Sequence, residues 1–151
     1  MTNPFVNGRF VEISVREIDL KFYLSGRFRD RLFYQGIRQK LQQMGHEVTS
    51  TWIDEDATLP PESIGTRFVA ERDVREIGGS DVVLSDTREP FSPHSGGGRE
   101  FERGIAYGRG THLWRVGPKR QAFHFLDEEE FHDWDAFFAF LIQLPTQTRD
   151  S

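Results

Sequence analysis

The sequence has no cysteine, which excludes disulfide bonds, thiolate metal ligands and a cysteine nucleophile. This absence agrees with a reducing compartment, and we expect a cytoplasmic protein. The sequence also has no apolar run near the 18 residues that a membrane span needs, and no charged-then-apolar leader follows Met1. We therefore expect neither a membrane span nor a secretory signal.

An excess of basic residues is also absent, because 19 Lys and Arg face 24 Asp and Glu, for a net charge of -5. Binding to nucleic acid polymers needs a broad basic surface, so we do not expect it. The histidines are scattered without HxH or HExxH spacing, and we expect no metal and no cofactor. One local basic cluster at Arg27, Arg29 and Arg31 suits a small phosphate or carboxylate ligand, or is a solvated helix face.

What the chain does have is enough apolar residues, 36% of 151, for one domain with a real core. Short apolar segments alternate with amphipathic ones, which predicts an α/β fold: a three-layer, doubly wound, mostly parallel five-stranded sheet of the flavodoxin or Rossmann kind. We place strands at 20–25, 46–53, 81–85 and 111–116, and helices at 30–44, 62–77, from about 98, and from the capping-box-like pair Asp127 and Glu130 onward. Residues 5–15 predict an extra hairpin or edge strand, so the chain divides into an extension (1–19), the domain (20–144) and a flexible tail (145–151).

A glycine-rich loop that enters a helix is the main candidate for a site. Gly98, Glu102 and Ala106 are spaced by four, so the glutamate lies between two positions with almost no side chain. If the helix begins near Gly98, its dipole favours the ionised form of Glu102 by roughly 0.3 to 1 kcal/mol. The segment fits an accessible nucleophile, or an ordinary helix start with first-turn glutamates.

In a doubly wound sheet, ligands bind at the carboxyl ends of the strands, so the loops at 25–27, 52–56, 86–98 and 117–120 should converge. With these pieces in order, the chain resembles the nucleoside 2-deoxyribosyltransferase family, which includes deoxynucleoside 5'-monophosphate N-glycosidases. The resemblance covers about residues 20–142. Its motifs are Phe22-Tyr23-Leu24-Ser25-Gly26-Arg27, Gly45 to Trp52, Asp73 followed by Ser80 to Leu84, and Glu102-Arg103-Gly104-Ile105-Ala106 followed by Gly110.

The resemblance implies cleavage of an N-glycosidic bond by Glu102, which attacks the anomeric carbon. Glu100 is a rival on spacing alone. Asp73 is implied as the proton donor to the leaving base, with Asp86 as second candidate. Asp73 borders the apolar face of its helix, where burial would raise its pKa, although it could also be exposed in a charge cluster.

The resemblance also implies a small-molecule nucleoside or nucleotide substrate. Trp52 could stack on its base or belong to the core. A 5'-phosphate would suit the segments that carry Tyr23, Ser25, Gly26 and Arg27 on one side and Ser95, Gly97 and Gly98 on the other. The tail has no asparagine of the kind that completes the site of transferases from a neighbouring subunit, so hydrolysis is better supported than transfer between bases.

Two other functions stay open. One is a catalytically silent nucleotide-binding module in which Glu102 pairs with Arg103 or Arg99, and the other is a glutamate-dependent hydrolase of NAD or a nucleotide sugar. The resemblance implies a homodimer or larger assembly. The aromatic segment 131–140 offers more rings than one helix face needs, which fits a subunit contact or packing on both sides within the domain.

Overall fold

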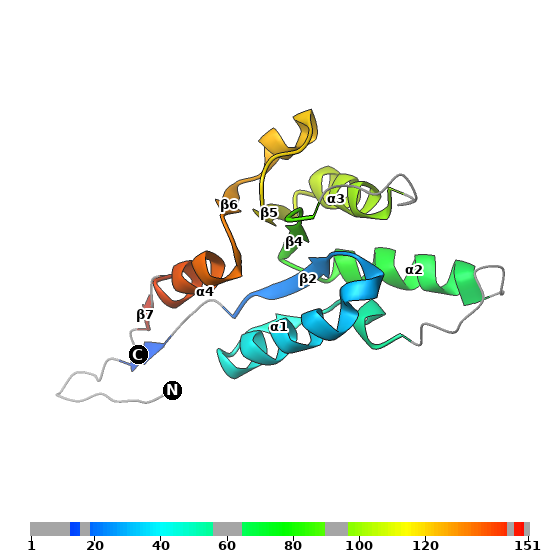
Figure 1. The fold of residues 1–151 in the computed structure, drawn as a ribbon. Helices are drawn as coiled ribbons and strands as arrows, with labels where there is room; N and C mark the ends of the chain where they lie inside the picture. The colour runs from blue at the N-terminus through cyan, green and yellow to red at the C-terminus, as the bar shows by residue number, and fades with distance from the viewer. Residues whose placement is uncertain (1–12, 16–18, 56–64, 90–96, 145–146, 150–151) are drawn as a thin grey trace.

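The computed structural model describes residues 13–15, 19–55, 65–89, 97–144 and 147–149 of the chain. Its centre is a five-stranded, all-parallel sheet in the order β3-β2-β4-β5-β6 (Figure 1). The strands are β2 (Lys21–Ser25), β3 (Glu47–Val48), β4 (Val82–Asp86), β5 (His112–Val116) and β6 (Glu129–Phe131). This is the flavodoxin-like order, and the expected α/β fold is confirmed.

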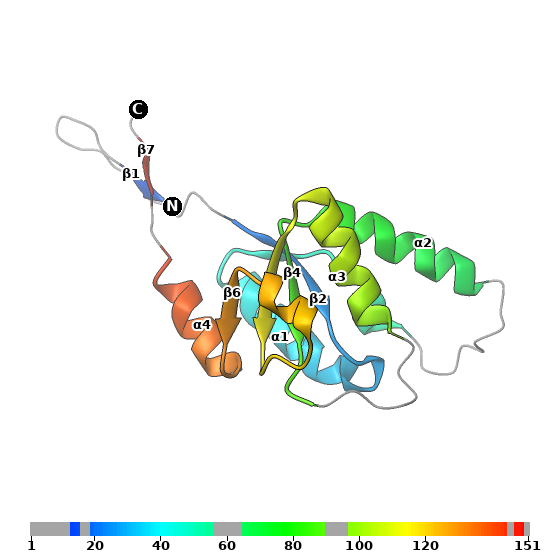
Figure 2. The same ribbon diagram turned by 90° about the horizontal axis from the view of Figure 1, so that it is seen from above.

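Helices cover both faces of the sheet, as Figures 1 and 2 show. α1 (Arg31–Gln43) and α4 (Trp134–Ile142) lie on one face, and α2 (Gly65–Gly78) and α3 (Gly98–Arg109) lie on the other. Three short 3-10 turns complete the domain: η1 (Phe28–Asp30), η2 (Trp52–Asp54) and η3 (Ala122–Leu126). No helix within the described ranges is long and apolar enough to cross a membrane.

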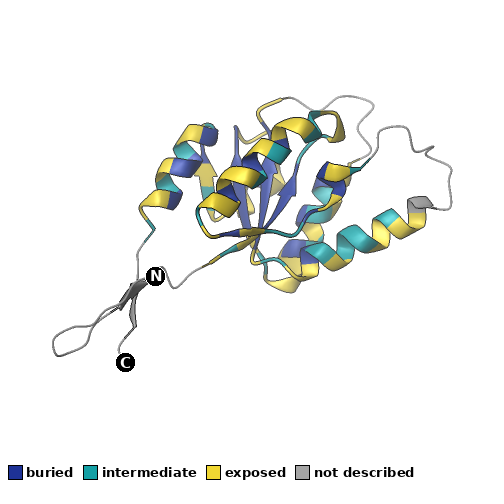
Figure 3. Ribbon diagram, turned by 90° about the horizontal axis from the view of Figure 1, so that it is seen from below, coloured by how far each residue is buried: buried dark blue, intermediate teal, exposed yellow. Residues whose placement is uncertain are grey.

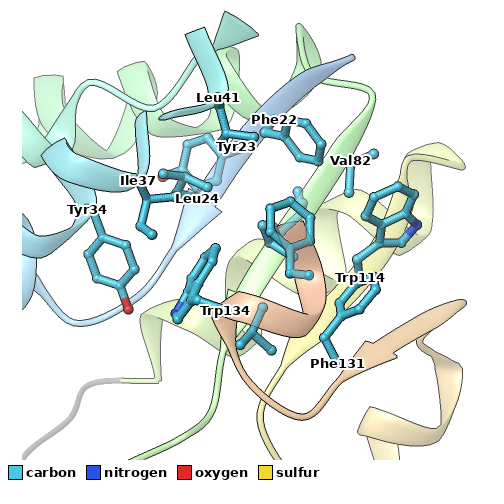
Figure 4. Packing of buried hydrophobic residues seen from close by; sticks show 14 of the residues in the cluster. Phe22, Tyr23, Leu24, Tyr34, Ile37, Leu41, Val82, Trp114, Phe131 and Trp134 are labelled. Atoms are coloured by element: carbon cyan, nitrogen blue, oxygen red, sulfur yellow. The ribbon is translucent and has the colours of Figure 1, made fainter. Parts of the chain in front are cut away.

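The core lies mainly between the sheet and the α1/α4 layer (Figures 3 and 4). Because side chains alternate along a strand, Phe22 and Leu24 of β2 point to this layer while Tyr23 and Ser25 point to the other. The Phe22 ring meets the Phe137 ring edge-on at a centroid distance of 5.8 Å. Such pairs add roughly 0.5–1.5 kcal/mol each beyond the burial of their area.

The C-terminal third differs from the expectation. Asp127 and Glu130 do not begin a helix: Asp127 precedes β6, and Glu130 lies in it. α4 begins at Trp134, and the Asp133 side chain caps it by accepting a hydrogen bond from the Ala136 N–H at 2.8 Å. β6 has only three residues, too few to show an alternating pattern in the sequence. The strand expected at 46–53 is likewise only β3, after which the chain turns into η2.

An extra strand is present near the N-terminus, β1 (Ile13–Val15). Its partner is β7 (Gln147–Arg149), with which it pairs antiparallel as a separate two-stranded ribbon that projects from the domain (Figure 2). Residues 147–149 were expected in a flexible tail. They form this strand instead, which corrects that part of the prediction. A polar Gln-Thr-Arg strand carries no apolar signal of its own, and its partner lies at the other end of the sequence.

Two large apolar side chains on the helices are exposed: Phe33 of α1 is 42% exposed and Phe68 of α2 is 63% exposed. On α1 the inward face is made by Tyr34, Ile37 and Leu41. The rings of segment 131–140 are mostly buried within the domain, including Trp134, Phe137 and Phe138. Packing within the domain therefore accounts for these rings.

Candidate active site

The Glu102 carboxylate lies against the end of β2, where two hydroxyl groups hold it. Tyr23 Oη donates a hydrogen bond to Glu102 Oε2 at 2.9 Å, and Ser25 Oγ donates one to Oε1 at 2.7 Å. Tyr23 and Ser25 are two apart on the strand, so they share the face that α3 covers. α3 begins at Gly98 as expected, which places Glu102 in its second turn.

Burial raises the pKa of Glu102 to about 7, although the hydrogen bonds from Ser25 and Tyr23 and the nearby Arg99 lower it. The negative charge of Asp73 raises it further. Near neutral pH the desolvation of Glu102 therefore outweighs the helix-dipole effect of about 0.3–1 kcal/mol that favours its ionised form. Burial also raises the pKa of Tyr23, so its hydroxyl stays protonated and remains a donor.

Asp73 on α2 faces the same site, since its charge acts on both Glu102 and Tyr23. Arg72 Nη2 and Nε both contact Asp73 Oδ1, at 2.8 and 3.2 Å. Burial raises the pKa of the Asp73 carboxyl, while Arg72 opposes that rise. Of the two alternatives left open for Asp73, the structure has partial burial, with 20% of the side chain exposed, although its partner is Arg72 of the charge cluster.

Arg72 was not singled out by the sequence, yet it anchors Asp73 to the neighbouring loop. Its Nη1 lies 3.3 Å from Glu55 Oε2. On the next turn of α2, Glu76 accepts hydrogen bonds from the N–H and the hydroxyl of Thr51, at 2.9 and 2.6 Å. α2 is thus fixed to the η2 loop on both sides of Asp73. The signal for this role in the sequence was that Arg72 directly precedes Asp73.

Asp86, the second candidate proton donor, lies on the wrong side of the sheet. Its carboxylate accepts hydrogen bonds from Tyr34 Oη (2.8 Å), Trp134 Nε1 (3.0 Å) and the Arg88 guanidinium (2.9 Å to Oδ2). These bonds together lower the pKa of Asp86 in spite of its burial. Its β4 neighbour Ser85 points to the α3 side, so alternation along the strand turns Asp86 away from Glu102.

Trp52 is a core residue. Its Nε1 donates to the Leu24 carbonyl oxygen at 2.7 Å, its ring lies 5.5 Å from the Tyr34 ring, and only 6% of it is exposed. The same tyrosine explains Gly26, because a Cβ there would lie 2.3 Å from Tyr34 Oη. Gly26 is therefore needed because the Tyr34 hydroxyl approaches its backbone too closely for any side chain.

Arg27 follows the carboxyl end of β2, but its guanidinium is already paired. Its Nε lies 3.1 Å from Asp30 Oδ2, and its Nη2 lies 4.0 Å from Glu89. An anionic ligand at Arg27 would therefore compete with two carboxylates.

The start of α3 is open and lies over the end of β4. Gly97, the N-cap residue, has a positive φ of 77° and, as a glycine, offers no side-chain cap. Gly97 and Gly98 are exposed. The Arg99 Nη1 donates to the Asp86 carbonyl oxygen at 2.6 Å, which fixes the helix start to the strand end. Ser95 lies outside the described residues.

Glu100 and Arg103 point to the opposite side of α3 from Glu102. Arg103 pairs with Asp127 at 2.7 Å and with Glu100 at 3.4 Å, and Glu100 also lies 3.3 Å from His124 Nε2. Glu100 is thus removed from Tyr23 and Ser25, and Arg103 is engaged away from Glu102. In the parts of the chain that the structure describes, no group of three or more acidic or histidine side chains could hold a metal ion.

No protein-family model matches this sequence, and no curated protein matches it. Solved structures do. The 2-deoxyribosyltransferase of the psychrotolerant bacterium Bacillus psychrosaccharolyticus superposes with a TM-score of 0.60 at 21% identity, over 85% of this chain and 98% of that one. The CMP N-glycosidase BcmB of Clostridium botulinum superposes with a TM-score of 0.54 at 14% identity, over 82% of this chain and 99% of that one.

This chain has their fold. At these identities the likeness establishes the architecture, which is the one that the sequence resemblance implied. The shared fold accounts for most of this chain, since the matches extend over 85% and 82% of it and over nearly all of each neighbour.

Proposed function

We propose that this protein cleaves the N-glycosidic bond of a nucleoside or nucleoside 5'-monophosphate, with Glu102 as the nucleophile. The observation that carries the proposal is the Glu102 carboxylate held by Tyr23 and Ser25 beside Asp73. A second support is the fold that the chain shares with a 2-deoxyribosyltransferase and a CMP N-glycosidase.

The chemistry follows from two carboxyl groups that share a site. The Glu102 oxygen forms a bond to the anomeric carbon while the bond from that carbon to the base nitrogen breaks, and the base takes a proton from Asp73. Water then attacks the same carbon and gives its proton to Asp73, and the ester bond breaks to restore the Glu102 carboxylate. Two displacements at one carbon give net retention, and another base in place of water gives transfer.

The hydroxyls of Tyr23 and Ser25 orient the nucleophile by fixing both carboxylate oxygens. Each oxygen keeps a second lone pair for the attack. The start of α3 with Gly97 and Gly98 supports binding of a 5'-phosphate, because the N-cap residue Gly97 has no side chain to bond the first backbone N–H groups. Ser95 remains a candidate for the same contact.

The contacts of Glu102 weigh against the silent binding module. That alternative has Glu102 pair with Arg103 or Arg99. Arg103 binds Asp127 and Glu100 instead, and the Glu102 oxygens accept hydrogen bonds from Tyr23 and Ser25 although the charge of Arg99 is nearby. Hydrolysis of NAD or a nucleotide sugar would use the same glutamate, so the released base decides between the two substrate classes. We also infer that the chain is cytoplasmic and homo-oligomeric.

The test is chromatography of products after incubation with nucleosides, deoxynucleosides, their 5'-monophosphates and NAD, with and without an acceptor base. We expect free base with the wild type and at least a 1,000-fold loss with Glu102→Ala, while Glu100→Gln, on the far side of the same helix, keeps most of the activity. Nicotinamide release would favour the NAD hydrolase. Nucleotide binding with no release from any substrate would favour the silent module.

A further inference from the structure

Arg72 of α2 lies among three carboxylates beside the candidate active site. Its Nε and Nη2 lie 3.2 and 2.8 Å from Oδ1 of Asp73. Its Nη1 lies 3.3 Å from Oε2 of Glu55, and its Nε lies 3.9 Å from Oε2 of Glu76. None of these four side chains is more than 20% exposed. One permanently charged guanidinium is therefore shared by three half-buried acids.

The contact between Arg72 and Asp73 does not follow from their adjacency in the sequence. Consecutive residues on a helix point about 100° apart and do not face each other. The guanidinium is held in place by Glu55 from the end of η2 and by Glu76 from the next turn of α2. Glu76 is itself fixed by the N–H and the hydroxyl of Thr51, at 2.9 and 2.6 Å. Two elements thus hold the arginine against Asp73.

The arginine contacts only one oxygen of Asp73. Both N–H groups donate to Oδ1, whereas Oδ2 accepts no hydrogen bond from the part of the chain that the structure describes. A hydrogen bond from a cation is strongest to an ionised oxygen, so Arg72 favours the negative charge on Oδ1. A proton on this carboxyl group therefore resides on Oδ2. Since the charge of Asp73 acts on Glu102, Oδ2 is the oxygen left for a ligand at the nucleophile.

We propose that Arg72 is a positioning residue for proton transfer to the leaving base, because it holds Oδ1 of Asp73 and so keeps the proton on Oδ2. The inference rests on the proposed function. When the glycosidic bond breaks, the O–H bond at Oδ2 breaks as well, its electron pair stays on the carboxyl group, and the base nitrogen gains the proton. The new negative charge is shared with Oδ1, where two N–H groups of Arg72 already donate. Arg72 thus acts through Asp73 and stabilises the charge that develops there.

A purely structural role for Arg72 predicts a different pattern of activity. In that case the arginine only ties α2 to the end of η2 through Glu55, and its loss would slow the release of every base alike. The positioning role concerns only bases that need a proton to leave. A base with a fixed positive charge, such as 7-methylguanine or 3-methylcytosine, leaves as a neutral molecule without one. The charge of the leaving base therefore separates the two roles.

The test compares the nucleotide that the wild-type chain cleaves fastest with its counterpart that carries the N-methylated, cationic base. With Arg72→Gln we expect kcat to fall about 10- to 100-fold for the ordinary base, with KM little changed, and less than about 3-fold for the cationic base. Arg72→Lys keeps the charge and should show the same pattern with a smaller loss. The matched control is Arg75→Gln, an exposed arginine of the same helix, which should leave both rates unchanged.

A second measurement does not depend on activity. Carbon-13 NMR of labelled aspartate carboxyl groups follows the pKa of Asp73, with Asp73→Asn to identify its signal, and circular dichroism checks that each variant is folded. Arg72→Gln should raise this pKa, because the cation that lowers it is gone.

The outcomes separate this inference from the proposed function. Equal losses for the ordinary and the cationic base would overturn the positioning role, and so would losses no larger than those of Arg75→Gln or an unchanged pKa of Asp73 in Arg72→Gln. Each of these results leaves the proposed function standing. A wild-type chain that releases no base from any substrate would overturn the proposed function, and this inference with it.

Discussion

At the scale of single residues, Glu102 combines burial with a pKa near 7. In the unfolded chain its pKa is about 4.5, so the folded state binds more protons than the unfolded state between these values. Ionisation of Glu102 therefore destabilises the folded protein as pH rises from about 4.5 to above 7. A carboxylate kept in such a place costs stability, as residues kept for function often do.

Replacing Glu102 by Gln should therefore stabilise the protein at high pH. We expect a gain of roughly 2–3 kcal/mol in the free energy of unfolding at pH 8, and close to none at pH 4.5, where the wild-type carboxyl is already neutral. Urea unfolding at both pH values measures it. Glu47→Gln, an exposed site, is the matched control, and an equal effect of Glu102→Gln at both pH values would contradict the raised pKa.

Asp73 and Glu102 should titrate as a pair, because the charge of Asp73 raises the pKa of Glu102. The proposed mechanism needs one proton on the pair: neither carboxyl is a nucleophile when both are protonated, and neither is an acid when both are ionised. The hydroxyl of Tyr23 stays protonated. The charged groups that act on Asp73 are Arg72, Glu55 and Glu76, and Asp73 in turn acts on Glu102.

We therefore expect kcat/KM to follow a bell-shaped pH profile whose upper limb lies near pH 7. Asp73→Asn removes the acid and a nearby negative charge, so the profile should become a low plateau reached above the now lower pKa of Glu102. Arg72→Gln removes the cation that lowers the pKa of Asp73, which should move the acidic limb upward. An unchanged profile in Asp73→Asn would exclude Asp73 as the proton donor.

At the scale of elements, the sequence predicted the helices and the longer strands because each has its own periodic pattern. The helix start at Gly98 and the strand at 81–85 show this. β6 and β7 were missed because three-residue strands have no period to detect, and their pairing depends on distant partners. Asp127 looked like a helix cap because its sequence neighbours fit one, whereas two buried arginines from other elements determine its place.

The candidate site, like the fold, could be predicted only in part from the sequence. Glu102 and Asp73 could be found from helical spacing and from the family resemblance. The side of the sheet on which Asp86 lies could in principle be read from alternation with Ser85, but only once the strand register is known. The contact of Tyr34 with Asp86 joins residues 52 positions apart, and no local pattern reports it.

Asp127 should be the most sensitive residue of the η3 region. Asp127→Ala leaves the guanidinium groups of Arg103 and Arg115 buried with a partner removed, which costs about 3–5 kcal/mol of unfolding free energy. The neighbouring Glu128→Ala breaks only an exposed contact with His112 and should cost less than about 1 kcal/mol. Urea unfolding of both variants compares them, and equal losses would show that the buried pairs do not stabilise the turn.

At the scale of the whole molecule, the core and the β1–β7 ribbon are separate. The side chains that define the core begin at Leu20, which packs at its margin, and end at Leu144. The ribbon is a ladder of three residue pairs that joins the two ends of the chain outside the sheet. An isolated two-stranded ribbon has marginal stability in water, so it adds little to the folding of the domain.

A chain shortened to residues 19–144 should therefore fold with the thermal midpoint of the full protein, within about 2 °C. A change of 1 kcal/mol moves the midpoint of a domain of this size by about 2–8 °C, so even a modest contribution from the ribbon would be visible in calorimetry. The matched comparison is a chain shortened to 25–144, which loses Phe22 and Tyr23 from the central strand and should not fold. A large drop in the midpoint of the 19–144 chain would mean that the ends of the sequence belong to the folding unit, and that the boundaries at 20 and 144 are wrong.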